Sequence, residues 1–237
     1  MSAELCTKSE GLFEELCQRD KVPYVRLKAL DHKQQPDYEI TPGGQLVVVE
    51  IKQIEPNNHD LQYAYALKTT GRAEQLRNPD EVAQRLRKHI RESRSQFRSY
   101  LKGRPVTPSL LVVFDNANNK YTHPDVIQTA LHGSERVELL LRKGHDPIVA
   151  DRGFGPRNNR TLRPGLNEHL SAVAALDECW LGEIGEPRQR VLGLRIFHNP
   201  YATVPLPLGL WSNPYVRHYT LSQKVPGQYQ HWVTLQS

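Results

Sequence analysis

The stretch PDYEITPGGQLVVVEIK, residues 36 to 52, decides how this chain of 237 residues begins its sheet. Two strand-like runs flank Gly43-Gly44, a dipeptide that supports a two-residue hairpin turn. Pairing outward from that turn places Asp37 opposite Glu50, and opposed residues share one side of a sheet with Cβ atoms about 5 Å apart. The sequence therefore predicts a hairpin on which two carboxylates face each other.

The same register gives the hairpin two different faces. Tyr38 faces Val49 across the strands, and Lys52 lies on the side of Asp37 and Glu50 because side chains alternate along a strand. The opposite side, which we expect to face a core, carries Val47, Val49 and Ile51. A bulge or a longer loop would shift the pairing by one residue and move every side chain to the other face.

Two directly opposed carboxylates repel each other, which makes them a poor choice for structure alone. A divalent cation between them removes the repulsion, and Mg²⁺ typically takes one or two carboxylates together with water and substrate phosphate. The ammonium group of Lys52 beside such a metal helps to place an attacking water. The alternative is structural, because Glu50 and Lys52 can also form an ordinary solvated pair on an edge strand.

Further elements are expected on both sides of the hairpin. Apolar residues recur at helical spacing over residues 3 to 18 and again over 79 to 102. Asn78 supplies a cap for the second helix, and Pro79 suits its first position. Residues 23 to 30 alternate between apolar and polar side chains, as a half-buried strand does.

Beyond the hairpin, residues 53 to 78 are polar and irregular, with a possible short helix at 61 to 67, and both an inserted flap and a plain surface loop remain open. Residues 108 to 115 are continuously apolar, which is typical of a strand buried on both faces. Weaker signals predict a helix at 123 to 132 and strands near 136 to 141, 170 to 176, 191 to 197 and 229 to 235. We expect a core at 1 to 115, on which residues 116 to 237 pack as an extension.

The pair Pro36-Asp37, followed by Glu50-Ile51-Lys52 at the end of the next strand, resembles the signature of the PD-(D/E)xK nuclease superfamily. The order helix, three strands, helix, strand is also similar to the core of that superfamily. The likeness covers about the N-terminal half of the chain. It implies a mixed α/β fold with a restriction-endonuclease-like core and a β-rich C-terminal extension.

The resemblance also implies an activity, namely metal-dependent hydrolysis of nucleic acid, with DNA a more frequent substrate than RNA. Mg²⁺ or Mn²⁺ would be the cofactor. Asp37 and Glu50 would bind it with the backbone carbonyl of Ile51, and Lys52 would position the nucleophilic water.

Two helices offer supporting residues by the same resemblance. The first helix of the family often supplies a glutamate; Glu14 fits that pattern as a ligand of a second metal or an outer-shell water, with Glu15 as the alternative. RecB-like branches carry a QxxxY motif on the helix after the hairpin, where this chain has Gln96 and Tyr100. Four residues apart, these two share one helix face. Two further candidates for binding substrate point near the same place, Arg85 and His89.

A second stripe of the same helix is basic and is expected to be a solvated face on the far flank: Arg87, Arg91, Arg94, Arg98 and Lys102. The net charge of +5 and pI of about 9.1 fit a nucleic-acid partner and fit an ordinary basic enzyme equally well.

Other features of the sequence bound the setting of the protein. The polar N-terminus and the lack of a run of about 18 apolar residues predict neither a signal peptide nor a membrane span. An odd number of cysteines, three, predicts reduced thiols and a cytoplasmic protein. Two other functions stay open: a non-catalytic nucleic-acid- or protein-binding module that keeps the fold, and metal chemistry on a non-nucleic phosphate.

Overall fold

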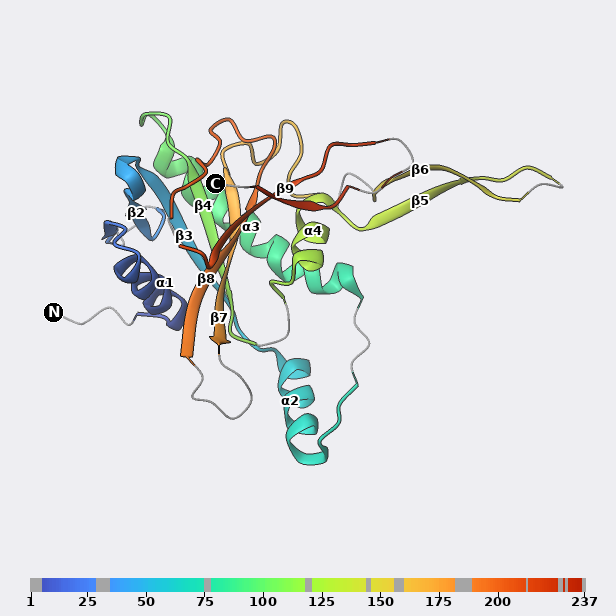
Figure 1. Cartoon of the computed structure of the whole chain (residues 1–237), viewed down its shortest axis with the longest axis horizontal. Helices are drawn as coiled ribbons and strands as arrows, with labels where there is room; N and C mark the ends of the chain where they lie inside the picture. The colour runs from blue at the N-terminus through green and yellow to red at the C-terminus, as the bar shows by residue number, and fades with distance from the viewer. Residues whose placement is uncertain are drawn as a thin grey trace.

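The computed structural model (Figure 1) describes residues 6–28, 35–74, 78–117, 121–143, 146–155, 160–181, 189–211, 213–225, 228 and 230–235. Its first half contains α1 (Lys8–Arg19), β1 (Tyr24–Arg26), β2 (Tyr38–Ile40), the 3₁₀ turn η1 (Pro42–Gly44), β3 (Val47–Ile54), α2 (Asn58–Thr70), α3 (Pro79–Leu101) and β4 (Ser109–Asp115). Its second half contains α4 (Pro124–His132), β5 (Glu135–Leu140), β6 (Ile148–Phe154), β7 (Ala172–Leu181), β8 (Gln189–His198), β9 (Val216–Leu221) and β10 (Trp232–Leu235).

Eight of the strands form one mixed sheet in the order β1-β2-β3-β4-β7-β8-β9-β10. The pairs β3–β4, β4–β7 and β8–β9 are parallel, and the other four pairs are antiparallel. β5 and β6 form a separate two-stranded sheet that projects from the body (Figure 1). The predicted mixed α/β class is confirmed, and strands from both halves of the chain share one sheet.

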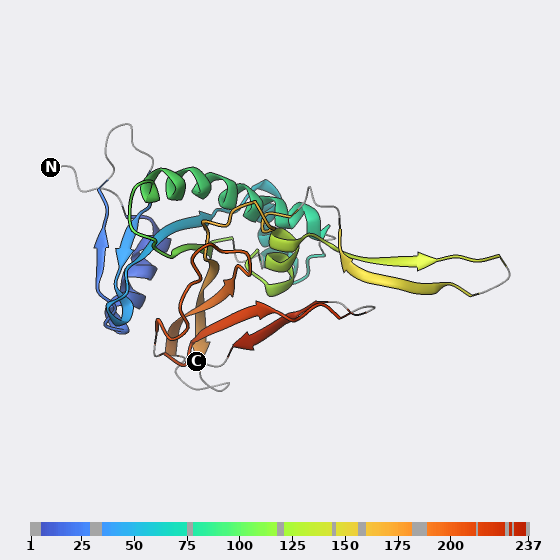
Figure 2. The same cartoon turned by 90° about the horizontal axis from the view of Figure 1, so that it is seen from above.

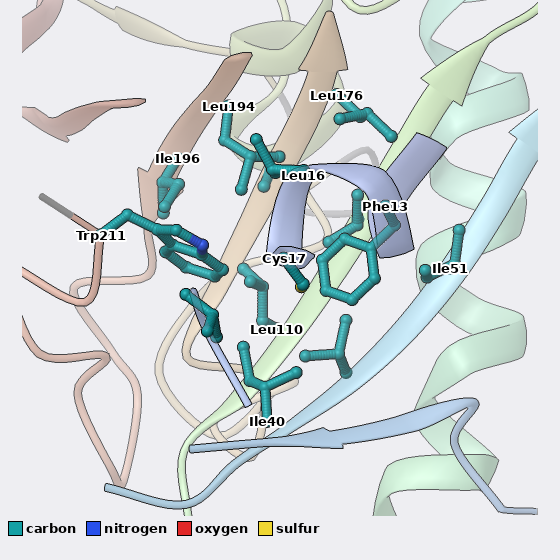
Figure 3. Packing of buried hydrophobic residues seen from close by; sticks show 14 of the residues in the cluster. Phe13, Leu16, Cys17, Ile40, Ile51, Leu110, Leu176, Leu194, Ile196 and Trp211 are labelled. Carbon is teal, nitrogen blue, oxygen red and sulfur yellow. The ribbon is translucent and has the colours of Figure 1, made fainter. Parts of the chain in front are cut away.

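Helix α1 covers one face of the sheet (Figure 3). Phe13, Leu16 and Cys17 are fully buried there against apolar side chains of the sheet and against Trp211 from the C-terminal half. The hairpin residues that the sequence assigns to a core belong to this cluster, namely Val47, Val49 and Ile51. One face of the hairpin is therefore fixed by packing against α1.

Helices α3 and α4 cover the opposite face (Figure 2). Leu86, Ile90 and Phe97 of α3 are buried together with Ile127 and Leu131 of α4. Helix α3 begins at the predicted proline, with an asparagine side chain capping its first turn. The strand predicted to be buried on both faces is β4, which lies between the two helical layers.

The hairpin keeps the predicted register, although its turn is different. Tyr38 lies opposite Val49, as expected. The connection is a 3₁₀ turn over Pro42–Gly44 rather than a two-residue β-turn, and Gly43 and Gly44 have φ values of 58° and 84° that favour glycine. The connection is longer than predicted, but it takes the same number of residues from each strand. The pairing between the strands is therefore unchanged, and the faces stay as predicted.

Several elements differ from the sequence-based expectations. Helix α2 extends well beyond the predicted 61 to 67, because Asn57 caps its start and Gly71, with φ of 69°, ends it. The strands β6 and β9 were not predicted at all. None of the helices in the described ranges combines the length and the apolar character needed to cross a membrane.

The solvated position predicted for Arg87 is wrong. Its side chain is buried, 4% exposed, and donates hydrogen bonds to Asp80 Oδ1 and to the Thr129 carbonyl, both at 2.8 Å. These contacts tie the first turns of α3 to α4. Arg87 therefore serves the packing between the two helices, because the carbonyl and carboxylate replace the water that a buried guanidinium loses.

We expect Phe97→Ala to lower the free energy of unfolding by about 3–5 kcal/mol, because it removes a fully buried ring between α3 and the sheet. Urea titration followed by circular dichroism measures the change. Leu61→Ala, on an exposed face of α2, is the control and should change stability by about 0.5 kcal/mol or less. Equal losses in both variants would contradict this description of the core.

Candidate active site

The Glu50 carboxylate lies in the interior of the sheet. Glu50 sits in the middle of β3, is 0% exposed, and has Leu111 of β4 as its parallel neighbour. The adjacent residues Val49 and Ile51 are held in the α1 core, so alternation along the strand turns Glu50 toward the α3 face. Neighbouring strands and packed helices therefore fix the position of this carboxylate.

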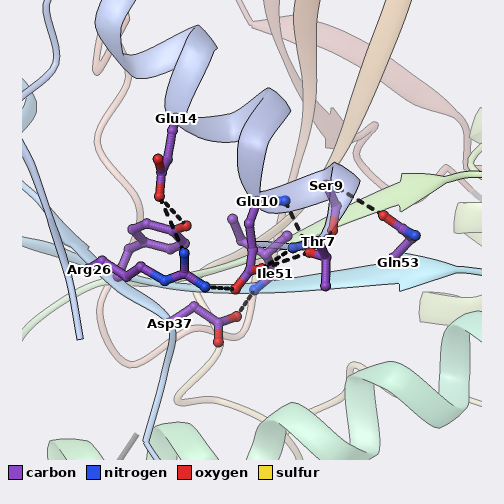
Figure 4. Close-up of polar contacts among 9 residues, drawn as sticks. Thr7, Ser9, Glu10, Glu14, Arg26, Asp37, Ile51 and Gln53 are labelled. Atoms are coloured by element: carbon purple, nitrogen blue, oxygen red, sulfur yellow. Dashed lines mark hydrogen bonds and ion pairs between the residues drawn. The ribbon is translucent and has the colours of Figure 1, made fainter. Parts of the chain in front are cut away.

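Asp37 reaches the same place from the edge of β2. Its backbone N–H donates to the Val49 carbonyl at 3.1 Å, which sets the start of the strand. Its Oδ2 accepts a hydrogen bond of 2.7 Å from the Ile51 N–H (Figure 4). This bond holds the Asp37 carboxylate over β3 beside Glu50, as the register predicted.

Lys52 completes the group of three. Its Nζ lies 2.5 Å from Glu50 Oε1, and its side chain is 24% exposed. Among the described residues, neither buried oxygen of Glu50 has a hydrogen-bond partner of good geometry. Asp37, Glu50 and Lys52, hereafter the acidic site, thus combine a buried carboxylate with a cation that solvent can reach.

Burial makes the acidic site electrostatically costly. It raises the pKa of Glu50 to about 7, with the charge of Asp37 as the next cause, while Lys52 and Gln96 act in the opposite direction. Burial likewise raises the pKa of Asp37, against the lowering effects of the Ile51 N–H and of Lys52. Both carboxyl groups therefore favour the protonated form more than free acids do, and a nearby cation would reverse this.

The first helix brings a different glutamate to the site from the one expected. Glu14 accepts a hydrogen bond of 2.7 Å from the Tyr38 hydroxyl, on the α1 face of the hairpin (Figure 4). Glu15 pairs with Arg190, far along the chain. The charge of Glu10, one turn earlier, is instead the one from α1 that raises the pKa of Asp37.

Glu10 was missed because its local pattern has another explanation. Thr7 and Glu10 form a capping box at the start of α1, the usual role of such a pair. Arg26 lies 2.9 Å from Glu10 Oε1 and 4.0 Å from Glu14 Oε1, so one guanidinium links both acids (Figure 4). The capping pattern was visible in the sequence, but its closeness to Asp37 was not.

The two residues of the QxxxY motif contact different groups. Gln96 Nε2 donates to the Gln35 carbonyl at 3.3 Å, and the Gln96 carboxamide also lowers the pKa of Glu50. The Tyr100 hydroxyl instead donates to Glu39 Oε1 at 2.7 Å, under a guanidinium stacked on its ring. The structure therefore brings Gln96 to the acidic site and ties Tyr100 to another carboxylate of β2.

The side chains of His89 and Arg85 also lie in different surroundings. Burial lowers the pKa of His89, with the charge of Lys52 as a smaller contribution, and its Nδ1 lies 3.3 Å from Glu92 Oε2 on the same helix. Arg85 donates to Asp60 Oδ2 at 3.0 Å and lies over the ring of Tyr121, 4.5 Å from its centroid. Arg85 thus links α3 to α2 rather than reaching the carboxylate pair.

The donor set of the acidic site fits a hard divalent cation. Asp37 and Glu50 supply carboxylate oxygens, two of them buried without good hydrogen bonds, and Ile51, whose N–H binds Asp37, follows Glu50 on the same strand. No cluster of three or more histidine, cysteine or acidic residues with metal-binding geometry occurs in the described part of the chain. One or two carboxylates plus water and phosphate are sufficient for Mg²⁺.

A cavity of about 560 Å³ lies elsewhere in the molecule, between the end of α1 and the segment around Trp211. Neither carboxylate of the acidic site lines it. No family model, curated protein or solved structure matches this chain.

In the metal-free protein, the gain in stability from Glu50→Gln should grow with pH. Below about pH 4.5 both states of wild type hold the proton, and the penalty then rises until pH passes the folded-state pKa of about 7. The variant should therefore overtake wild type by on the order of a few kcal/mol at about pH 7.5 in EDTA. Urea unfolding across this range measures it.

Phe97→Ala is the control for that series, because it removes no titrating group and its stability difference should not vary with pH. A difference between Glu50→Gln and wild type that is flat with pH would contradict the raised pKa of Glu50.

Proposed function

We propose that this chain is a metal-dependent nuclease whose core resembles that of the restriction endonucleases and whose acidic site is its active site. The observation that supports the proposal is the convergence of the half-buried Asp37 with the fully buried Glu50, with Lys52 Nζ 2.5 Å from Glu50 Oε1. An arrangement that destabilises the metal-free protein is expected where function requires it.

A structural role explains the three residues less well. A solvated Glu–Lys pair, the alternative, would have both groups in water, whereas Glu50 is fully buried. A purely structural ion pair needs only one acid and one base. Asp37 places a second carboxylate beside Glu50, and this adds repulsion. A divalent cation is the partner that removes this repulsion.

The residues of the acidic site have separable roles in this proposal. Asp37 and Glu50, with the Ile51 carbonyl, would hold Mg²⁺ or Mn²⁺, which when bound supplies charge neutralisation on the phosphate and a more acidic water. Lys52 donates hydrogen bonds to the attacking water and to a phosphate oxygen, with Glu50 keeping its ammonium in place. Gln96 orients the Glu50 carboxylate through its carboxamide.

The surroundings of the site support a phosphodiester substrate. Lys52 provides donors beside the carboxylates, and the chain has a net charge of +5. DNA rather than RNA follows from the resemblance to the nuclease superfamily. The free thiols of Cys6, Cys17 and Cys179 are consistent with a reducing compartment such as the cytoplasm.

We predict that Asp37→Asn and Glu50→Gln each reduce Mg²⁺-dependent cleavage of labelled DNA by on the order of 10²–10³-fold, the usual effect of removing one electrostatic group from an active site. Lys52→Ala should slow single-turnover cleavage by a similar factor without weakening metal binding. Glu39→Gln, a carboxylate two residues from Asp37 that is engaged with Tyr100, is the matched control and should cut at nearly the wild-type rate.

Gel assays with single- and double-stranded DNA and RNA, in Mg²⁺, Mn²⁺ and EDTA, measure these rates. Wild-type rates in either carboxylate variant would refute the catalytic assignment. Wild-type protein that binds DNA in every metal yet never cleaves it would favour the non-catalytic module.

Metal should stabilise wild type and do so much less for Asp37→Asn. A cation that binds only the folded state adds about 2.7 kcal/mol at a hundredfold excess over its dissociation constant. Thermal melts with Mg²⁺, Mn²⁺ or EDTA measure this, with Glu39→Gln again responding as wild type does. If no metal raises the melting temperature of any of the three proteins, metal binding at the acidic site is refuted.

A further inference from the structure

The β5–β6 hairpin, residues 135–154, extends from the body as an arm (Figure 2). Its base is anchored: Phe154 packs against His132 with ring centroids 5.6 Å apart, and Lys224 Nζ lies 3.3 Å from Asp151 Oδ2. Beyond the base the arm is a two-stranded ribbon, and every residue of β5 is exposed. An isolated two-stranded hairpin is only marginally stable in water.

The arm also exposes an unusual amount of apolar surface. Six of its large apolar side chains are between 39 and 72% exposed: Val137, Leu139, Leu140, Leu141, Ile148 and Val149. Their clustering on one projecting segment separates them from scattered surface residues, which need no explanation. The outer edge of β5 has no strand beside it among the described residues. An apolar edge of this kind is suited to pairing with a further strand.

The charges of the arm favour a protein partner over a nucleic acid. Residues 135–154 contain four basic and four acidic side chains, so the arm has no net charge to attract a polyanion. Within the hairpin, Glu138 lies directly opposite Asp151, whose carboxylate is paired with Lys224, whereas no ion pair of Glu138 occurs among the described residues. The arm therefore presents in Glu138 a carboxylate that a cation from a partner strand would neutralise.

We propose that β5 pairs antiparallel with β5 of a second copy of this chain, about a two-fold axis at Val137. In this register Arg136 of each copy faces Glu138 of the other, and Val137 faces itself. The guanidinium of the second copy then lies directly opposite Glu138, on the same side of the sheet. One strand thus supplies both halves of two ion pairs.

The neighbouring registers that keep the same faces are disfavoured by charge. A slip of two residues toward the tip places Glu138 opposite itself, and a slip of two toward the base does the same for Arg136. A slip of one residue would bring opposite faces of the two ribbons to the same side. The pairing centred on Val137 is therefore selected, and it yields a four-stranded antiparallel sheet in the order β6-β5-β5-β6.

The association of the full-length chain tests this pairing by a charge swap. Analytical ultracentrifugation of wild type should show a monomer–dimer equilibrium. Arg136→Glu and Glu138→Arg should each weaken the dimer at least tenfold, because each creates two like-charge contacts. The double variant Arg136→Glu/Glu138→Arg should return to near the wild-type dissociation constant, because the contacts are again between opposite charges. Circular dichroism spectra should be alike for all four proteins, because the substitutions lie on the exposed β5 strand.

Crosslinking tests the register separately. In a Cys6→Ser/Cys179→Ser background, which removes the two exposed thiols, Val137→Cys should form a disulfide-linked dimer under mild oxidation. Leu140→Cys is the matched control: each copy lies three residues from the axis, so the two thiols would be roughly 20 Å apart and should not link.

Each experimental outcome either supports the β5–β5 pairing or overturns it. Restoration by the double variant together with a Val137-specific crosslink supports the pairing. A protein that is monomeric up to millimolar concentration, or a double variant no better than either single one, overturns it. Equal crosslinking at both positions indicates random collision and also overturns it. If the chain is monomeric and Arg136→Glu instead weakens binding to duplex DNA, the arm serves a nucleic acid and the proposal fails. None of these readouts depends on nuclease activity.

Discussion

A carboxylate held inside the sheet, that of Glu50, is the constraint to which the surrounding structure is adapted. Removing an ionisable group from water is unfavourable unless other groups compensate, and here burial by itself shifts the acid toward its protonated form. The strand cannot relieve this by rotating, because Val49 and Ile51 are packed under α1 and strands lie on both sides. The surrounding core thus fixes both the position of the Glu50 carboxylate and the free-energy cost of ionising it.

The electrostatics of the site extend beyond the hairpin. Glu10 closes the first turn of α1 through Thr7 and also acts on Asp37 from the opposite side of the strand. Arg26 of β1 balances this charge by linking Glu10 to Glu14. A helix cap, an edge strand and a buried carboxylate are therefore coupled, so changes at the start of α1 alter the proton affinity of the acidic site without touching it.

The C-terminal half divides into two parts with different physical character. β7 to β10 extend the main sheet; β7 and β8 are largely buried, and His198 and His218 meet in the interior with ring nitrogens 2.9 Å apart. The β5–β6 arm leaves the sheet and keeps its apolar side chains in solvent. The body gains stability by burial, whereas the arm keeps an edge with which no strand pairs in the described part of the chain.

The sequence by itself determined the elements whose signals are local. Helical periodicity predicted α1 and, with its cap, α3; the apolar run predicted β4, and counting outward from Gly43-Gly44 predicted the register that sets Asp37 against Glu50. Tertiary structure alone decided which distant residues meet: the burial of Arg87 against α4, the action of Glu10 on Asp37, and the diversion of Tyr100 to Glu39. The physical reason is the distance along the chain over which each effect acts. Backbone preferences and side-chain alternation act over a few residues, whereas burial and charge depend on what the folded chain brings together from far along the sequence.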